Sequence, residues 1–224
     1  VCHAEGDSAI ASGDASHAEG ASTNASGFAS HAEGVNTIAS GNTSHAEGAT
    51  TNAGGDYSHA EGRSTIASGD YSHAEGRGTI ASGDYSHAGG HDTIASGFAS
   101  YAGGESTIAS GTFSHAGGSE ATASGINSFI HSTTSTVDSI NGVILGGSGC
   151  TLTGDYSVMI GCSNLTASTS NVVYVPDLII NGLISTDPLA TDINGKIVAG
   201  ASDIRLKMNI NGLTSGLDTI NKLR

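Results

Sequence analysis

Residues 58–71 read SHAEGRSTIASGDY, and this block returns every fourteen residues over more than half of the chain. Each half of the block alternates in character over a few residues and closes on a glycine, Gly62 in the first half and Gly69 in the second. A period of two indicates short β-strands, and glycine supplies the positive φ of tight turns. Fourteen residues are too few for a helical repeat. The sequence therefore predicts an all-β solenoid in which each repeat forms one coil, with two strands and two turns, of a parallel β-roll.

The repeat keeps its phase in four columns of residues. The histidine column contains His3, His17, His31, His45, His59, His73, His87, Tyr101 and His115. The glutamate column, two residues later, contains Glu5, Glu19, Glu33, Glu47, Glu61 and Glu75. Two glycine columns run from Gly6 to Gly118 and from Gly13 to Gly125. Stacked coils in a parallel roll would place the members of each column about 4.8 Å apart.

The alternation also predicts which side chains face inward. Ser58, Ala60, Thr65 and Ala67 share one parity and are all small, as the narrow space between two back-to-back strands requires. The opposite parity places one isoleucine outside in most coils. This isoleucine row consists of Ile10, Ile38, Ile66, Ile80, Ile94 and Ile108. Burying each isoleucine is worth roughly 1.5–3 kcal/mol, and an exposed apolar stripe usually marks an interface.

We therefore expect the isoleucine row to be a subunit contact. A trimer with these faces turned to a common axis is the favoured assembly, although a dimer would also bury one face. Asn24, Asn52 and Thr122 interrupt the row and are candidates for polar layers that set the register between subunits.

The fourteen-residue pattern, with its S-x-A-x-G half-repeats, resembles the head repeats of trimeric autotransporter adhesins over residues 1–125. The resemblance implies a left-handed parallel β-roll in a homotrimer. The chain departs from that family where histidine and glutamate replace the family's usual aliphatic residues. This departure leaves open which face looks toward the trimer axis.

Three interpretations of the histidine and glutamate columns compete. The favoured one is a solvated polar face, because a strictly repeated surface motif usually serves architecture. The second is a subunit contact held by His–Glu pairs. The third is a site for a divalent metal, which imidazole and carboxylate at positions i and i+2 could bind; no metal or other cofactor is expected. If the glutamates hold the imidazoles protonated, the histidine pKa rises and its stabilising contribution fades as the pH climbs through that value.

Composition excludes several classes of function. The formal charge of −14 gives no basic stripe for nucleic acid and disfavours anionic membrane surfaces. No apolar run is long enough to span a membrane. Three cysteines form no even framework, so no disulfide is expected, and Cys150 and Cys162 are predicted to be small buried hydrophobes. No small-molecule enzyme activity is predicted. Val1 lies inside a repeat, so we expect the chain to be part of a longer protein.

The chain divides into four predicted sections. Residues 1–125 form the repeat roll, and residues 126–170 continue it as a wider β-solenoid section with larger apolar residues. Residues 171–201 form a β transition and connector, and residues 202–224 end the chain with a short helical segment.

The last section begins SDIRLKMN and resembles the opening of the intramolecular chaperone of endosialidase type, found at the ends of phage tail spikes and fibres. That family's domain trimerises the fibre and then releases itself by self-cleavage. The resemblance makes Ser202 the nucleophile and Lys207 its base, which a burial-lowered lysine pKa would permit. The competing interpretation is that Lys207 is a surface charge and Ser202 a cap.

Two functions follow from these resemblances. The first is the shaft of a phage-like virion tail fibre or other surface fibre that supports attachment to a host receptor or glycan. The second is the head of a bacterial trimeric autotransporter adhesin on the cell surface. In both, the partners are two further copies of the chain and a host surface, with no membrane insertion.

Overall fold

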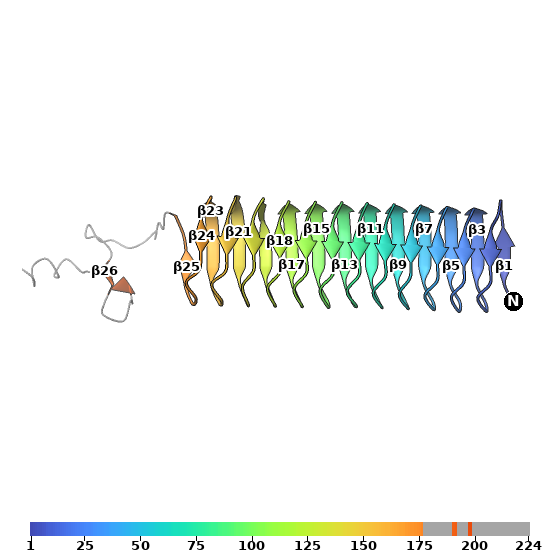
Figure 1. Cartoon of the computed structure of the whole chain (residues 1–224), viewed down its shortest axis with the longest axis horizontal. Coiled ribbons are helices and arrows are strands. Elements are labelled where there is room, and N and C mark those ends of the chain that lie inside the picture. Colours follow the sequence, from blue (N-terminus) through green and yellow to red (C-terminus); the bar gives the residue numbers. More distant parts are fainter. Residues whose placement is uncertain (177–189, 192–196, 199–224) are drawn as a thin grey trace, which may run out of the picture. The chain divides into compact units, whose positions relative to one another are not determined.

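The computed structural model describes residues 1–176, 190–191 and 197–198 of the chain. Residues 1–176 form one compact unit. This unit is a parallel β-solenoid in which each coil has one longer and one two-residue strand, and the coils stack along a single axis (Figure 1). None of the described residues lies in a helix. The all-β parallel fold predicted from the repeat is therefore confirmed, while its handedness stays a prediction.

The longer strands stack into a sheet of thirteen, called sheet A here. Its strands are β1 (His3–Glu5), β3 (His17–Ala21), β5 (His31–Val35), β7 (His45–Ala49), β9 (His59–Arg63), β11 (His73–Arg77), β13 (His87–His91), β15 (Tyr101–Glu105), β17 (His115–Ser119), β19 (Phe129–Thr133), β21 (Val143–Ser148), β23 (Val158–Ser163) and β25 (Val173–Tyr174).

The two-residue strands stack into a second sheet of twelve, sheet B. Its strands are β2 (Ile10–Ala11), β4 (Asn24–Ala25), β6 (Ile38–Ala39), β8 (Asn52–Ala53), β10 (Ile66–Ala67), β12 (Ile80–Ala81), β14 (Ile94–Ala95), β16 (Ile108–Ala109), β18 (Thr122–Ala123), β20 (Thr136–Val137), β22 (Thr151–Leu152) and β24 (Thr166–Ala167).

The register repeats the sequence period without a slip through the first nine coils. In sheet A, His59 pairs with His73 and Glu61 with Glu75. In sheet B, Ile66 pairs with Ile80. Because each residue lies beside its own equivalent in the next coil, every column of the sequence becomes a straight line of side chains on the roll.

The interior is filled by the small residues that parity predicted. Ala60 and Ala67 are fully buried, and so are Ser58 and Thr65. Ser58 donates a hydrogen bond of 2.6 Å from its hydroxyl to the carbonyl oxygen of Gly55, which satisfies the hydroxyl inside the roll. A core built from alanine, serine and threonine is thin, so most larger apolar side chains of the repeats lie on the outside.

The two glycine columns serve different purposes. Gly62 has φ +105, as expected for a turn glycine, but Gly69 does not have a positive φ. At Gly69 a side-chain Cβ would overlap the carbonyl of Gly83 in the next coil, so the column is required by close approach of backbones. The left-handed conformation falls on residues such as Ser64 and Tyr71, two positions after each glycine. The prediction of a positive φ was therefore right for one column only.

The last coils are built on a longer unit. Thr136 pairs with Thr151, a step of fifteen residues, and the register shifts between β19 and β21. The interior there holds Ile144, Leu152 and Met159, all fully buried. Larger apolar residues thus replace alanine in the core, as the composition of this stretch predicted.

Cys150 and Cys162 form a disulfide between successive coils, with their Cα atoms 6.3 Å apart. The prediction that no disulfide forms was wrong, although both cysteines are buried as expected. Cys162 pairs in register with Gly147, and its side chain reaches Cys150 inside the roll. Cys2 is free and exposed.

A second compact unit covers Asp177–Arg224. Its described residues are β26 (Ala190–Thr191) and β27 (Ile197–Val198), which pair antiparallel. Ser202, Lys207 and the short C-terminal helix expected after them lie outside the described residues. Among the described residues, no helix is long and apolar enough to cross a membrane.

Candidate functional site

The outer face of sheet A carries the histidine and glutamate columns as one continuous surface. We call it the His/Glu ladder; it comprises the seven histidines that are the first residues of sheet A strands β1 to β13 and the six glutamates of strands β1 to β11. The strand alternation that buries Ala60 turns His59 and Glu61 to the outside, where both are half-buried by their neighbours along the column. The prediction that these side chains point outward from the roll is thus confirmed, and the choice between a solvated face, a subunit contact and a metal site stays a prediction.

The imidazole rings stack on one another along the ladder. Ring centroids of His31 and His45 are 4.7 Å apart with the planes parallel, and His59 and His73 repeat this at 5.0 Å. The stack tilts at His87 and continues through Tyr101 and His115 to Phe129. The roll therefore fixes the orientation of each imidazole.

Carboxylates approach the edges of these rings. Nε2 of His59 lies 3.6 Å from a carboxylate oxygen of Glu47, and Nε2 of His73 lies 3.4 Å from Glu61. Glu47, Glu61 and Glu75 thus reach the histidine of the following coil. Glu5 and Glu33 instead contact the histidine of their own coil. The contacts are ion pairs only when the imidazole is protonated.

The structure disfavours protonated histidines in the middle of the ladder. Burial, reinforced by the neighbouring histidines, lowers the pKa of His45, and burial together with His73 lowers the pKa of His59. The hypothesis that the glutamates raise the histidine pKa is therefore wrong at these two positions. Neutral imidazoles stack here without mutual charge repulsion.

The glutamates crowd one another along the same face. A hydrogen bond with Glu33, together with burial and a hydrogen bond with Glu61, raises the pKa of Glu47 to about 7. The pKa of Glu61 is lowered, because its carboxylate accepts the hydrogen bond from Glu47. Neighbouring carboxylates thus share a proton near neutral pH. A groove of about 440 Å³ runs beside them, lined by Glu19, Glu33, Glu47, Glu61 and the glycines that follow.

The outer face of sheet B carries the isoleucine row. Ile38 is 41% exposed and Ile66 37%, while Ile80 and Ile94 are half-buried by their neighbours. Asn24 and Asn52 occupy the same column and pair in register with isoleucines, as the sequence predicted. The row is therefore an uncovered apolar stripe on the single chain; whether it forms the trimer interface stays a prediction.

Sheet A has a second apolar surface in its last coils. In the two columns that carry histidine and glutamate earlier, β21 has Val143 and Leu145, and β23 has Val158 and Ile160. Leu145 is 41% exposed and Ile160 42%. We call these four residues the C-terminal apolar patch. The wider section predicted from the sequence therefore does not bury all of its large apolar residues, because alternate residues of a strand face outward.

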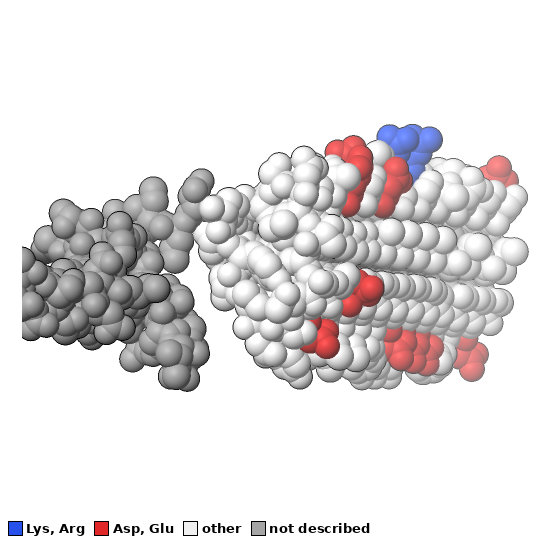
Figure 2. All heavy atoms as spheres, turned by 60° about the vertical axis from the view of Figure 1, so that its left-hand side comes forward, with Lys and Arg blue, Asp and Glu red and all other residues white. Residues whose placement is uncertain are grey.

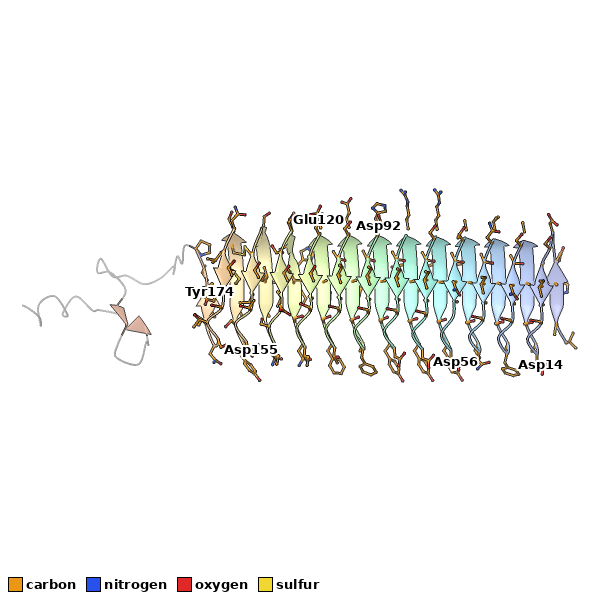
Figure 3. All side chains as sticks on the ribbon, in the orientation of Figure 1. Asp14, Asp56, Asp92, Glu120, Asp155 and Tyr174 are labelled. Atoms are coloured by element: carbon orange, nitrogen blue, oxygen red, sulfur yellow. A yellow bond between two sulfur atoms is a disulfide. The ribbon has the colours of Figure 1, made fainter. Side chains whose placement is uncertain are left out.

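The turns at the two edges of the roll differ in character. Asp14, Asp56 and Asp155 lie at one edge and Asp92 and Glu120 at the other (Figure 3). At the first edge the aspartates link coils: Oδ1 of Asp56 accepts a hydrogen bond of 2.8 Å from the backbone N–H of Asn42. Next to them lies a line of exposed aromatic rings, in which Tyr57, Tyr71 and Tyr85 stack on one another. Phe98 and Phe113 continue the line with edge-to-face contacts.

Charge on the roll is predominantly negative. Arg63 and Arg77 are the only lysine or arginine residues within residues 1–176 and account for the basic cluster in Figure 2, where acidic residues form separate groups over the same face. That nucleic acid is not a partner stays a prediction.

Comparison with known proteins finds one family in the repeats. Residues 32–51, 60–86 and 88–114 match the family model described as the YadA head domain repeat. No curated protein matches the chain. The match lies within the coils from β5 to β16 and agrees with the resemblance to adhesin heads; it includes none of residues 202–224.

Proposed function

We propose that this chain is the head segment of a trimeric adhesin-type fibre on a bacterial surface, with a structural and adhesive role and no catalytic one. The observation that carries the proposal is the roll itself: part of it matches YadA head repeats, and an apolar row lies uncovered along it. We therefore favour the adhesin head over the phage-like fibre as the function of this chain.

The thin core of the single chain favours assembly into an oligomer. Alanine side chains contribute little buried apolar area, whereas each coil of the isoleucine row could add roughly 1.5–3 kcal/mol if a neighbouring subunit covered it. YadA head domains form trimers. Three copies around a common axis, each turning sheet B inward, would cover all six isoleucines and leave the His/Glu ladder in solvent.

The C-terminal apolar patch is the competing contact. It lies on sheet A, so a trimer built on it would turn the opposite face of the roll toward the axis and enclose the His/Glu ladder. The patch is more compact than the isoleucine row but covers only two coils. We favour the isoleucine row because it extends over eight coils.

Light scattering of the purified chain at micromolar concentration tests the proposal. A particle three times the 22.0 kDa chain mass is expected, and a monomer would overturn it. The double variant Ile66→Asp, Ile80→Asp should dissociate the trimer, because six carboxylates would be buried at one contact. The double variant Leu145→Asp, Ile160→Asp is the matched control. Dissociation by the second pair alone would assign the axis to sheet A.

A phage-like tail fibre is the second candidate, and it rests on Ser202 and Lys207 at their chaperone-like spacing. Processing next to Ser202 in the protein extended beyond Arg224 would support it. A Ser202→Ala variant that is still processed would remove this serine from the mechanism. In either fibre we propose a host receptor or glycan as the external partner.

A further inference from the structure

The His/Glu ladder brings three potential metal ligands together at three places along sheet A. The groups are His31, Glu33 and His45; Glu47, His59 and Glu61; and Glu61, His73 and Glu75. Within each group the ligand atoms all lie within 4.8 Å of one another. Each group spans two adjacent coils, because a strand supplies its own histidine and glutamate and the neighbouring strand supplies the third residue.

Carboxylate oxygens of the ladder lie 3.4–3.7 Å from the ring nitrogens of His31, His59 and His73 that would bind a metal. The Nε2 atoms of His31, His45, His59 and His73 are shielded from solvent, and none of them makes a hydrogen bond within the described structure. A buried polar atom without a hydrogen bond costs free energy, so a cation between these nitrogens and the neighbouring carboxylates would relieve that cost.

The chemistry of the groups selects a class of metal. Imidazole with carboxylate suits Zn²⁺ and its first-row neighbours, whereas Ca²⁺ and Mg²⁺ prefer sites made of oxygen atoms. Neutral imidazole is the form that binds a metal. Metal–ligand bonds of about 2.0–2.1 Å place tetrahedral ligands about 3.3 Å apart, so pairs of ligand atoms within 4.8 Å of one another need to close by at most about 1.5 Å.

We propose that the His/Glu ladder binds a row of divalent transition-metal ions of the Zn²⁺ type, each held between two coils by three protein ligands. Glu61 belongs to two groups, so the chain holds two ions when Glu61 serves one group and three when it bridges. Each ion would neutralise crowded glutamates and fasten adjacent coils to each other. The ligands of each site come from one chain, so the proposal does not depend on the trimer.

The glutamate column ends before the histidine column does, which limits where a metal can bind. After Glu75 the glutamate column continues as Gly89, Gly103 and Gly117. His115 keeps the histidine position in β17, but Gly117 takes the place of the carboxylate beside it. Metal binding is therefore confined to the first six coils, and His115 is a natural control.

Calorimetric titration of the full chain with ZnCl₂, after chelator treatment and without a histidine tag, tests the proposal. Two to three Zn²⁺ per chain are expected, with no comparable binding of Mg²⁺. Glu61→Gln removes the ligand common to two groups and should lower the count to one. The triple variant His45→Gln, His59→Gln, His73→Gln should abolish binding, whereas His115→Gln should leave it unchanged.

X-ray absorption of the Zn²⁺-loaded chain provides a readout that is independent of stoichiometry. Nitrogen or oxygen neighbours near 2.0 Å, with outer-shell scattering from imidazole, are expected. Circular dichroism shows whether each variant keeps the roll. Fewer than one Zn²⁺ per folded wild-type chain would overturn the proposal. A folded triple variant that binds as many ions as the wild type would overturn it too.

Discussion

Replacing Gly69 by alanine tests how closely the coils approach at the second glycine column. The added Cβ would overlap the carbonyl of Gly83 and lie 2.9 Å from the backbone nitrogen of Asp84, inside normal van der Waals distance. Both neighbours are backbone atoms, so no side chain can rotate away. Backbone hydrogen bonds on both sides oppose separation of the coils, among them the bond of 2.9 Å from Ser68 N–H to the carbonyl of Ala81.

We expect Gly69→Ala to lower the free energy of unfolding by about 2–3 kcal/mol, near the upper end of the usual overpacking cost. For a chain of this size that loss corresponds to a fall in Tm of about 4–12 °C. Thermal unfolding followed by circular dichroism measures it. Wild type and variant must be compared at one protein concentration, because an oligomer's Tm depends on concentration.

Gly54→Ala is the matched control in the preceding coil. Gly54 occupies the column that other coils fill with serine, and a Cβ there would meet nothing closer than 3.7 Å. Its expected effect is within about 0.5 kcal/mol of zero. Equal losses of Tm in both variants, or an unchanged Tm in Gly69→Ala, would refute the close-approach explanation.

Three further predictions concern the core, the disulfide and pH. Ala81→Val should destabilise the roll by about 1–3 kcal/mol in urea unfolding, because Ala81 is fully buried between the sheets; an unchanged midpoint would mean that the interior has spare room. Replacing both Cys150 and Cys162 by serine should cost about 2–4 kcal/mol, and a variant that unfolds like the oxidised wild type would argue against the cross-link. Because the pKa values of His45 and His59 are lowered on folding, the unfolded chain binds protons first and stability falls as the pH drops through about 6.5. Glu47, with its pKa raised to about 7, acts in the opposite direction, since it contributes stability that is lost as the pH rises through 7. The double variant His45→Gln, His59→Gln retains Glu47, so its Tm should fall less than that of the wild type between pH 7.5 and 5.5; equal falls would contradict the histidine assignment.

Much of the fold could be predicted from the sequence because the repeat supplies the same information many times. The alternation of residues alone predicted that Ala60 faces inward and Ile66 outward, and that the His/Glu ladder lies on the outside of sheet A. A single copy of the block would not have separated a strand from an irregular turn. The phase of the columns also determined the register between coils.

What the sequence could not predict depends on contacts between coils. The number of cysteines did not predict the disulfide. Only the register that aligns Cys162 with Gly147 brings the side chain of Cys162 to Cys150. The direction of the pKa shift at His45 required the stacking distance to its neighbours, since burial and adjacent imidazoles outweigh the glutamates. Likewise, the role of Gly69 appeared only when the next coil's carbonyl was in place.

The central claim is that fourteen residues form one self-contained coil of the roll. Deletion of residues 59–72, one whole repeat, should leave every remaining column in phase, so the variant should unfold cooperatively with a β-type circular dichroism spectrum and a Tm close to that of the wild type. Deletion of residues 59–71, one residue fewer, moves side chains to the wrong face at the junction and should lower the Tm sharply. If thermal unfolding shows the same Tm for both deletions, or if the fourteen-residue deletion abolishes folding, the coil assignment is wrong.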